Sequence, residues 1–145
     1  MANISHTYAG MTHSPFLSGH GAKNILVAEV DVTADNLAAE DRWNFFKLPA
    51  DTIVTAAYLY TEDLDSHGTP TLTLNLKTED EDGNAGATIL SADTTARTGG
   101  WAAADAALPV LTDAADFYVF AEVQAAPATA AAGKAKLVLE VLRTA

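Results

Sequence analysis

Hydrophobic and polar residues alternate with a period of two in several short segments, as in β-strands with one buried face. In residues 71–77, Leu72, Leu74 and Leu76 point to one side and the polar side chains between them point to the other. Two later segments, 116–124 and 134–142, alternate in the same way. No segment keeps a 3.6-residue period, so the pattern predicts a chain made of strands.

We expect seven or eight strands, bounded by turn dipeptides such as Asp82-Gly83 and Gly99-Gly100. They cover residues 25–32, 43–48, 52–60, 71–77, 87–92, 116–124 and 134–142, and one more at 108–111 within an ambiguous alanine-rich segment. Short strands without crossover helices are typical of an all-β antiparallel β-sandwich. With about eight strands we expect a jelly roll. An immunoglobulin-like sandwich comes second, because the Cys…Trp…Cys spacing is absent.

The first 24 residues differ from the rest of the chain. They are rich in Gly, Ser, Thr and His, contain no Asp or Glu, and show no period. We therefore expect an extended N-terminal arm over 1–24 and a β-sandwich domain over 25–145. His6, His13 and His20 are seven residues apart, but the intervening Gly and Pro residues disfavour a helix. We prefer chance spacing to a metal-binding or pH-sensing stripe.

Several predicted strands carry apolar side chains on both faces. A sandwich needs only one apolar face per sheet, so something must cover the second face. Two interpretations stay open: the chain's own loops or arm, or a subunit interface. The side chains concerned are Tyr58, Tyr60, Tyr118, Phe120, Val138 and Leu142.

Composition excludes several classes of protein. The absence of cysteine excludes thiol catalysis, zinc fingers and disulfide frameworks. The formal charge of −11 makes nucleic acid and anionic membranes poor partners. No apolar run approaches the roughly 20 residues that span a bilayer, and the first residues lack the features of a secretory signal. The 145 residues correspond to one domain.

The stretch EDLDSHGTP (62–70) is the densest group of candidate chemical residues. An EF-hand counted from Asp63 fails, because Leu74 stands where the loop needs glutamate. His67 is the only histidine outside the arm, and no nucleophile elbow or zinc-protease motif occurs, so we expect no catalytic residue and no cofactor. A turn explains the stretch better, with polar side chains capping the backbone, positive φ at Gly68 and Pro70 fixing the next strand.

Residues 78–84, TEDEDGN, form the matching acidic turn at the other end of that strand. Cation binding at the two turns is a weaker alternative, with Asp63, Asp65, Asp80 and Asp82 as the weak metal candidates. Exposed aromatic rings can stack on sugars. Trp43 and Trp101 are therefore candidates for a carbohydrate site, although for Trp101 we favour a buried anchor or an interface residue.

The run LPADTIVTAAYLYTEDLDSHGTPTLTLNLKTEDEDGN (48–84) resembles the head decoration, or cement, proteins of tailed bacteriophages. The shared features are a strand entered through Leu-Pro-Ala, an aromatic strand end before the TEDLDSxGTP turn, the alternating TLTLNL strand and an acidic Asp-Gly turn. The alternation resumes in ADFYVFAEVQAA (115–126) and KAKLVLEVL (134–142). The resemblance covers roughly residues 36–143, and the arm carries no matching motif.

The resemblance implies a jelly-roll protein without a catalytic role, which decorates and stabilises a capsid from its outer surface. Its expected partners are the major capsid protein and two further copies of itself, as a homotrimer at threefold positions. In the arm, we expect apolar anchors at Ile4, Tyr8, Phe16 and Leu17. The alternatives are another virion β-protein, such as a head-fibre base or tail component, and a calcium- or carbohydrate-binding module.

Overall fold

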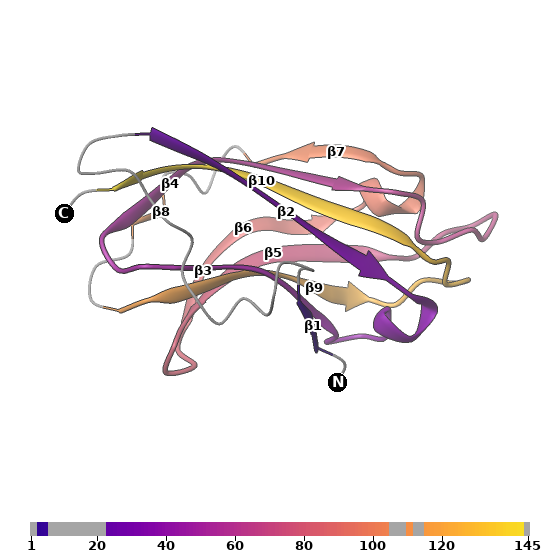
Figure 1. Cartoon of the computed structure of the whole chain (residues 1–145). Helices are drawn as coiled ribbons and strands as arrows, with labels where there is room; N and C mark the ends of the chain where they lie inside the picture. Colours follow the sequence, from indigo (N-terminus) through magenta and orange to yellow (C-terminus); the bar gives the residue numbers. More distant parts are fainter. Residues whose placement is uncertain (1–2, 6–22, 105–109, 112–114, 144–145) are drawn as a thin grey trace.

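The computed structural model describes residues 3–5, 23–104, 110–111 and 115–143, and these form two sheets packed face to face (Figure 1). One sheet, here the β9 sheet, has the strand order β1-β3-β9-β5-β6. The other, here the β10 sheet, has the order β2-β10-β4-β7, with β8 also paired to β4. Side-chain detail extends over 23–104 and 115–142.

The elements have the following bounds: β1 Asn3–Ser5, β2 Lys23–Val32, β3 Arg42–Leu48, β4 Thr52–Thr61, β5 Thr73–Asp80, β6 Ala85–Asp93, β7 Gly100–Ala103, β8 Val110–Leu111, β9 Phe117–Ala125 and β10 Gly133–Arg143. Two short 3-10 turns, η1 Ala34–Asn36 and η2 Thr95–Arg97, lie in the connections. Among the described residues, no helix has the length and hydrophobicity to cross a bilayer.

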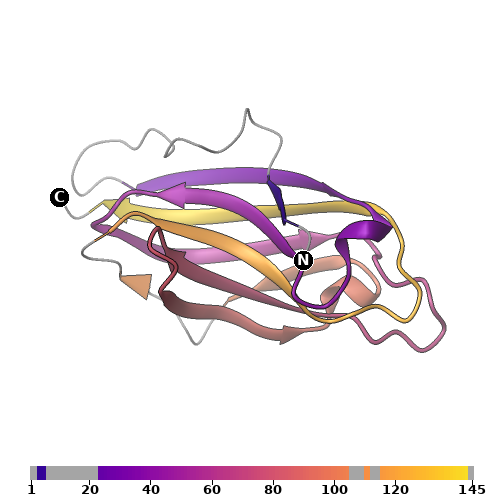
Figure 2. The same cartoon turned by 90° about the horizontal axis from the view of Figure 1, so that it is seen from below.

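The strand order is that of a jelly roll. Leaving aside the short β1 and β8, each sheet has four strands, and every connection crosses between the sheets except the β5–β6 hairpin. The pairings are antiparallel apart from β1 with β3, which is parallel. Figure 2 shows the two layers from below. The predicted all-β jelly roll is therefore confirmed, and the immunoglobulin-like alternative is not observed.

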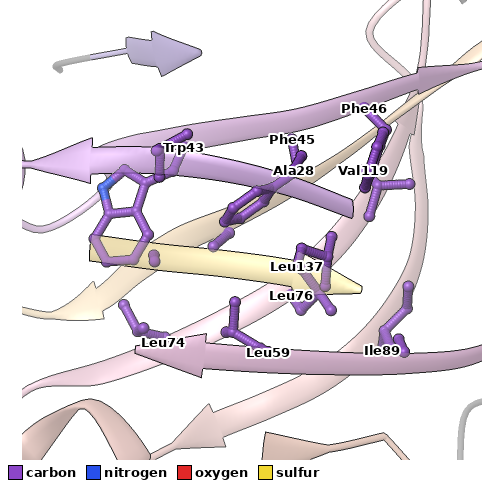
Figure 3. Close-up of a cluster of buried hydrophobic side chains, with 14 of the residues drawn as sticks. Ala28, Trp43, Phe45, Phe46, Leu59, Leu74, Leu76, Ile89, Val119 and Leu137 are labelled. Carbon is purple, nitrogen blue, oxygen red and sulfur yellow. The ribbon is translucent and has the colours of Figure 1, made fainter. Parts of the chain in front are cut away.

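The core lies between the sheets and is filled by the alternating apolar residues. Leu74 and Leu76 of β5 and Leu137 of β10 all lie in this layer, and all three are fully buried (Figure 3). The pairing of β3 with β9 shifts register between Asn44 and Phe46, so the consecutive Phe45 and Phe46 are both buried. Such a bulge turns an additional side chain toward the core.

Two segments, the predicted arm and the alanine-rich segment, differ in detail from the predicted strands. The predicted arm contains β1, whose Ile4 lies opposite Trp43 on the edge of β3, and residues 6–22 lie outside the described part. The alanine-rich segment contains β7 at Gly100–Ala103, before the expected 108–111, where β8 occupies only two residues. Alternation cannot identify β7, because its only large side chain is Trp101.

One buried carboxylate, Asp65, joins the β4–β5 loop to the β9–β10 loop. Its side chain is 1% exposed. Oδ2 accepts the backbone N–H groups of Thr71 at 2.7 Å, Leu72 at 3.1 Å and Ala128 at 3.0 Å, and Oδ1 accepts those of Thr129 at 3.0 Å and His67 at 3.4 Å. Two of these donors lie more than 60 residues away along the chain, so Asp65 fixes a tertiary contact as well as a local turn.

The charge state of Asp65 follows from its surroundings. Burial by itself raises the pKa of a carboxyl, because it disfavours the charged form. The N–H groups of Thr129, Thr71, Ala128 and Leu72 outweigh burial and hold the pKa of Asp65 well below its ordinary value of 3.8. The folded carboxylate therefore stays ionised at pH values at which an ordinary aspartate takes up a proton.

We expect Asp65→Asn to lower the free energy of unfolding by about 3 kcal/mol. An asparagine amide has one acceptor oxygen, so whichever way it turns, at least two N–H groups of this junction lose their acceptor. Urea denaturation at fixed protein concentration measures the loss. The matched control is Asp63→Asn, because Asp63 is exposed and accepts one N–H, from Asp65 at 3.1 Å. Equal stability of the two variants would contradict the role given to Asp65.

The lowered pKa of Asp65 also predicts that the free energy of unfolding decreases at acidic pH. Below about pH 4 the unfolded Asp65 takes up a proton while the folded one does not, so the free energy of unfolding falls as the pH falls. The contribution is fully present above the unfolded pKa of 3.8. We expect the stability difference between wild type and Asp65→Asn to narrow below pH 4 by up to about 1.4 kcal/mol per pH unit. A difference that stays constant from pH 6 to pH 2.5 would contradict this.

Candidate functional site

The exposed large hydrophobic side chains of the described residues gather on one surface. They are Ile25, Val27, Tyr58 and Trp101, which are 70%, 50%, 45% and 57% exposed. Strand alternation and register place all four on the outer face of the β10 sheet, opposite the core. We call this surface the apolar outer face.

The apolar outer face is organised in rows that cross the strands. The central row runs Val27, Val138, Tyr58 and Ala103, one residue from each of β2, β10, β4 and β7, and contains no charge. The next row toward the β4–β5 loop ends in Tyr60 and Trp101, whose ring centroids are 5.2 Å apart. Each row is continuous because directly opposed side chains on neighbouring strands touch.

Charged residues border this face and are paired with each other. Lys134 Nζ lies 3.1 Å from Glu29 Oε1, and Lys23 Nζ lies 3.4 Å from Glu140 Oε1. The hydrogen bond from Lys134 lowers the pKa of Glu29, and Glu29 in turn raises the pKa of Lys134. The border therefore carries compensated charge, while the centre is apolar.

The outer face of the β9 sheet has the opposite character, because the chain's own charged side chains cover its aromatic rings. The guanidinium carbon of Arg42 lies 3.6 Å from the centroid of the Phe120 ring, and Arg42 also pairs with Glu79. Lys47 Nζ lies 5.7 Å from the centroid of the Tyr118 ring. Cation–π contacts and ion pairs together satisfy this face within one chain.

The predicted partner-binding residues therefore divide between the two faces. Tyr58, Tyr60, Val138 and Leu142 lie on the apolar outer face. Tyr118 is half-buried and Phe120 is 4% exposed, so Phe120 has almost no surface to offer a partner. Of the expected anchors in the arm, Ile4 is described only as part of β1, and Tyr8, Phe16 and Leu17 lie outside the described residues, as do His6, His13 and His20.

The sequence did not lead us to Ile25 and Val27, and it left three interpretations for Trp101: a carbohydrate-stacking ring, a buried anchor or an interface residue. The signal for Ile25 and Val27 was present, because residues 25–28 are apolar without interruption and a strand of that kind has two apolar faces. Trp101 is exposed and its partner Tyr60 is half-buried, so Trp101 is not a buried anchor. Trp43, the other carbohydrate candidate, is fully buried, and its Nε1–H donates to the Asn36 carbonyl at 3.0 Å.

Three of the four weak metal candidates, Asp63, Asp65 and Asp80, accept backbone N–H groups in the turns, and Asp82 is exposed. Asp65 is occupied by the junction between the two loops, and Asp63 accepts the N–H of Asp65. Asp80 accepts the N–H groups of Asp82 and Asn84 at 3.0 and 2.8 Å. No group of three or more His, Asp or Glu side chains in the described residues is arranged to hold a metal ion.

The turn interpretation holds for the acidic stretches, with one correction. Positive φ occurs at Gly83, in the 78–84 turn, and Gly68 is not among the positive-φ residues. His67 Nδ1 accepts the N–H of Thr69 at 2.9 Å, so this histidine shapes the loop in which it lies.

The sequence matches no protein-family model and no curated protein. Solved structures do match. A chain in the capsid of Ralstonia phage GP4 is 25% identical, with a TM-score of 0.81 over 99% of both chains. A chain in the cyanophage Pam1 capsid asymmetric unit is 25% identical, with a TM-score of 0.73 over 93% of this chain and 94% of that chain.

A third match, to a chain of the acid-stable capsid of Helicobacter pylori bacteriophage KHP30, shows the fold alone. It has 19% identity and a TM-score of 0.50 over 88% of this chain and 92% of that chain. The jelly roll described above is thus found, over nearly the whole chain, in components of two phage capsids, which supports a structural role in a virion.

Proposed function

We propose that this chain decorates the outer surface of a bacteriophage capsid and stabilises it by binding major capsid protein subunits, as a homotrimer at threefold positions. The observation that carries the proposal is the match to the GP4 capsid chain, which extends over 99% of both chains. Because the match includes both sheets and the loops between them, it concerns the whole architecture and not one shared sheet. The proposed role is structural and involves no catalytic step.

The mechanism is one of linked binding. A protein that binds the assembled shell more tightly than its separate subunits stabilises the shell by mass action. Three copies held in one trimer turn three modest contacts into one avid attachment, because binding of the first copy raises the effective concentration of the others. The formal charge of −11 favours solubility of the free protein before it docks.

Decoration predicts a large copy number. Purified protein added to capsids that lack it should bind until hundreds of copies are present per particle, and should raise the temperature at which the capsids break. Quantitative gel densitometry of purified particles and thermal disruption assays measure both quantities. A few copies per particle would instead indicate a vertex or tail component. A monomer that ignores capsids but melts at higher temperature with calcium or a sugar would indicate a binding module.

If the arm carries apolar anchors, changing them should weaken capsid binding without affecting the folding of the protein. Because apolar side chains buried against a partner contribute binding free energy, the triple variant Tyr8→Ala, Phe16→Ala and Leu17→Ala should fold normally and bind capsids much more weakly. This variant retains β1, whereas deletion of residues 2–20 removes it. Comparing the two variants therefore distinguishes the contribution of the apolar anchors from that of the edge strand β1. Cosedimentation with capsids is the measurement. Normal binding of both variants would contradict a role for the arm.

A further inference from the structure

We propose that the apolar outer face of the β10 sheet is covered by a second copy of this chain. The inference rests on the proposed function, in that a decorating homotrimer needs a subunit contact. It names the surface that makes that contact, and it can be measured without any capsid.

The face has the layout of a subunit interface. The uncharged row from Val27 to Ala103 forms its centre, and aromatic side chains, which are enriched in interfaces, lie at Tyr58, Tyr60 and Trp101. The rows on either side bring in the charged residues of β2 and β10. An apolar centre with a paired, charged border is the arrangement of interfaces that exclude water at the centre and tolerate it at the rim.

The size of the face sets what it can do. Four strands spaced about 4.8 Å apart, followed over about 20 Å of their length, give roughly 300 Å² before the side chains spread outward. This area includes the charged residues of the two neighbouring rows, so the apolar centre is smaller than the roughly 300–600 Å² of the largest apolar patch on a typical monomer. A standard interface buries about 800 Å² on each partner. The apolar centre therefore needs its charged border and a partner of matching charge.

Charge selects a second copy as that partner. The four strands of the β10 sheet carry three lysines and three carboxylates on their outer face, so this face is neutral although the chain has a formal charge of −11. These residues are Lys23, Lys134, Lys136, Glu29, Asp31 and Glu140. Much of the excess negative charge lies in the end turns, at 62–65 and 80–82. Because this face is neutral, acidic copies can meet through it around a threefold axis without bringing like charges together.

The partners that are present when the chain folds also favour a second copy. An exposed apolar patch promotes non-specific association from the moment the chain folds. Another copy is present at the same concentration as the patch itself, whereas a capsid becomes available only after it has assembled. The β9 sheet does not need such a partner, because Arg42 and Lys47 already lie over its aromatic rings.

The test compares two substitutions of equal charge on the two sheets, in the full-length chain. Val27→Glu puts a carboxylate into the central row of the apolar outer face. Thr88→Glu puts one on the β9 sheet, at an exposed strand position opposite Lys77. Ile25→Lys repeats the first change with the opposite sign, at a side chain that is 70% exposed and therefore contributes little to folding of the single chain. Circular dichroism and melting check that each variant folds.

Light scattering and native mass spectrometry over a concentration series give the result. Wild type and Thr88→Glu should have three times the chain mass of 15.1 kDa. Val27→Glu and Ile25→Lys should dissociate to single chains, with the dissociation constant raised by about a hundredfold or more, because an unpaired charge is buried.

Other results assign the face elsewhere and overturn the inference. Variants that keep the wild-type mass would show that the copies meet through another surface. A monomeric wild type whose Val27→Glu variant melts at lower temperature would assign the face to residues 6–22 of the same chain. A monomeric wild type that loses capsid binding on the same substitution would assign it to the capsid. Self-association through this face without capsid binding would contradict only the proposed function.

Discussion

Two sheets that share one core leave two outer faces, and the side chains of the described residues cover only one of them. On the β9 sheet, Arg42 lies over Phe120 and pairs with Glu79, so the aromatic ring is sealed within a single chain. On the β10 sheet, the central row from Val27 to Ala103 contains no charged side chain, and the lysines of the border pair with carboxylates. Some other surface must therefore cover that row. The proposed assembly follows from this difference: charged side chains lie over the aromatic rings of the β9 sheet and not over the central row of the β10 sheet.

Carboxylates of the same type play different parts according to their surroundings. Asp65 is surrounded by backbone N–H groups from two loops and fixes one end of the sandwich, whereas Asp80 caps its own exposed turn. Glu29 and Glu140 pair with lysines and neutralise the border of the apolar outer face. The high formal charge is therefore unevenly distributed: it accumulates in turns exposed to water and cancels on both sheet faces. A molecule built in this way can be repelled at its ends and still associate through a sheet.

Much of the fold could be predicted, because the alternation of apolar and polar residues within a strand is a local feature of the sequence. Much of the site could not be predicted, because whether an outer side chain is covered depends on residues far away along the chain. The period of two in 71–77 and 134–142 indicated which side chains enter the core, and the number of strands indicated a jelly roll. The paired Phe45 and Phe46 break the alternation through a bulge, and β7 has too few large side chains to show it. Phe120 and Tyr58 have similar positions in their patterns, yet only Phe120 is covered, by a residue 78 positions earlier in the chain. Likewise, the role of Asp65 depends on donors at 128 and 129, which no local motif reveals.

The jelly roll that this chain shares with chains of phage capsids has one outer face that the described residues leave open. Since the chain has no cysteine, one introduced thiol reports on one position without interference. The most direct measurement is the rate at which a thiol reagent labels Val27→Cys, compared with Thr88→Cys on the other sheet. The account predicts that Val27→Cys reacts at least about tenfold more slowly at high protein concentration, and that dilution removes the difference as the copies separate. Equal labelling rates at every concentration would contradict it.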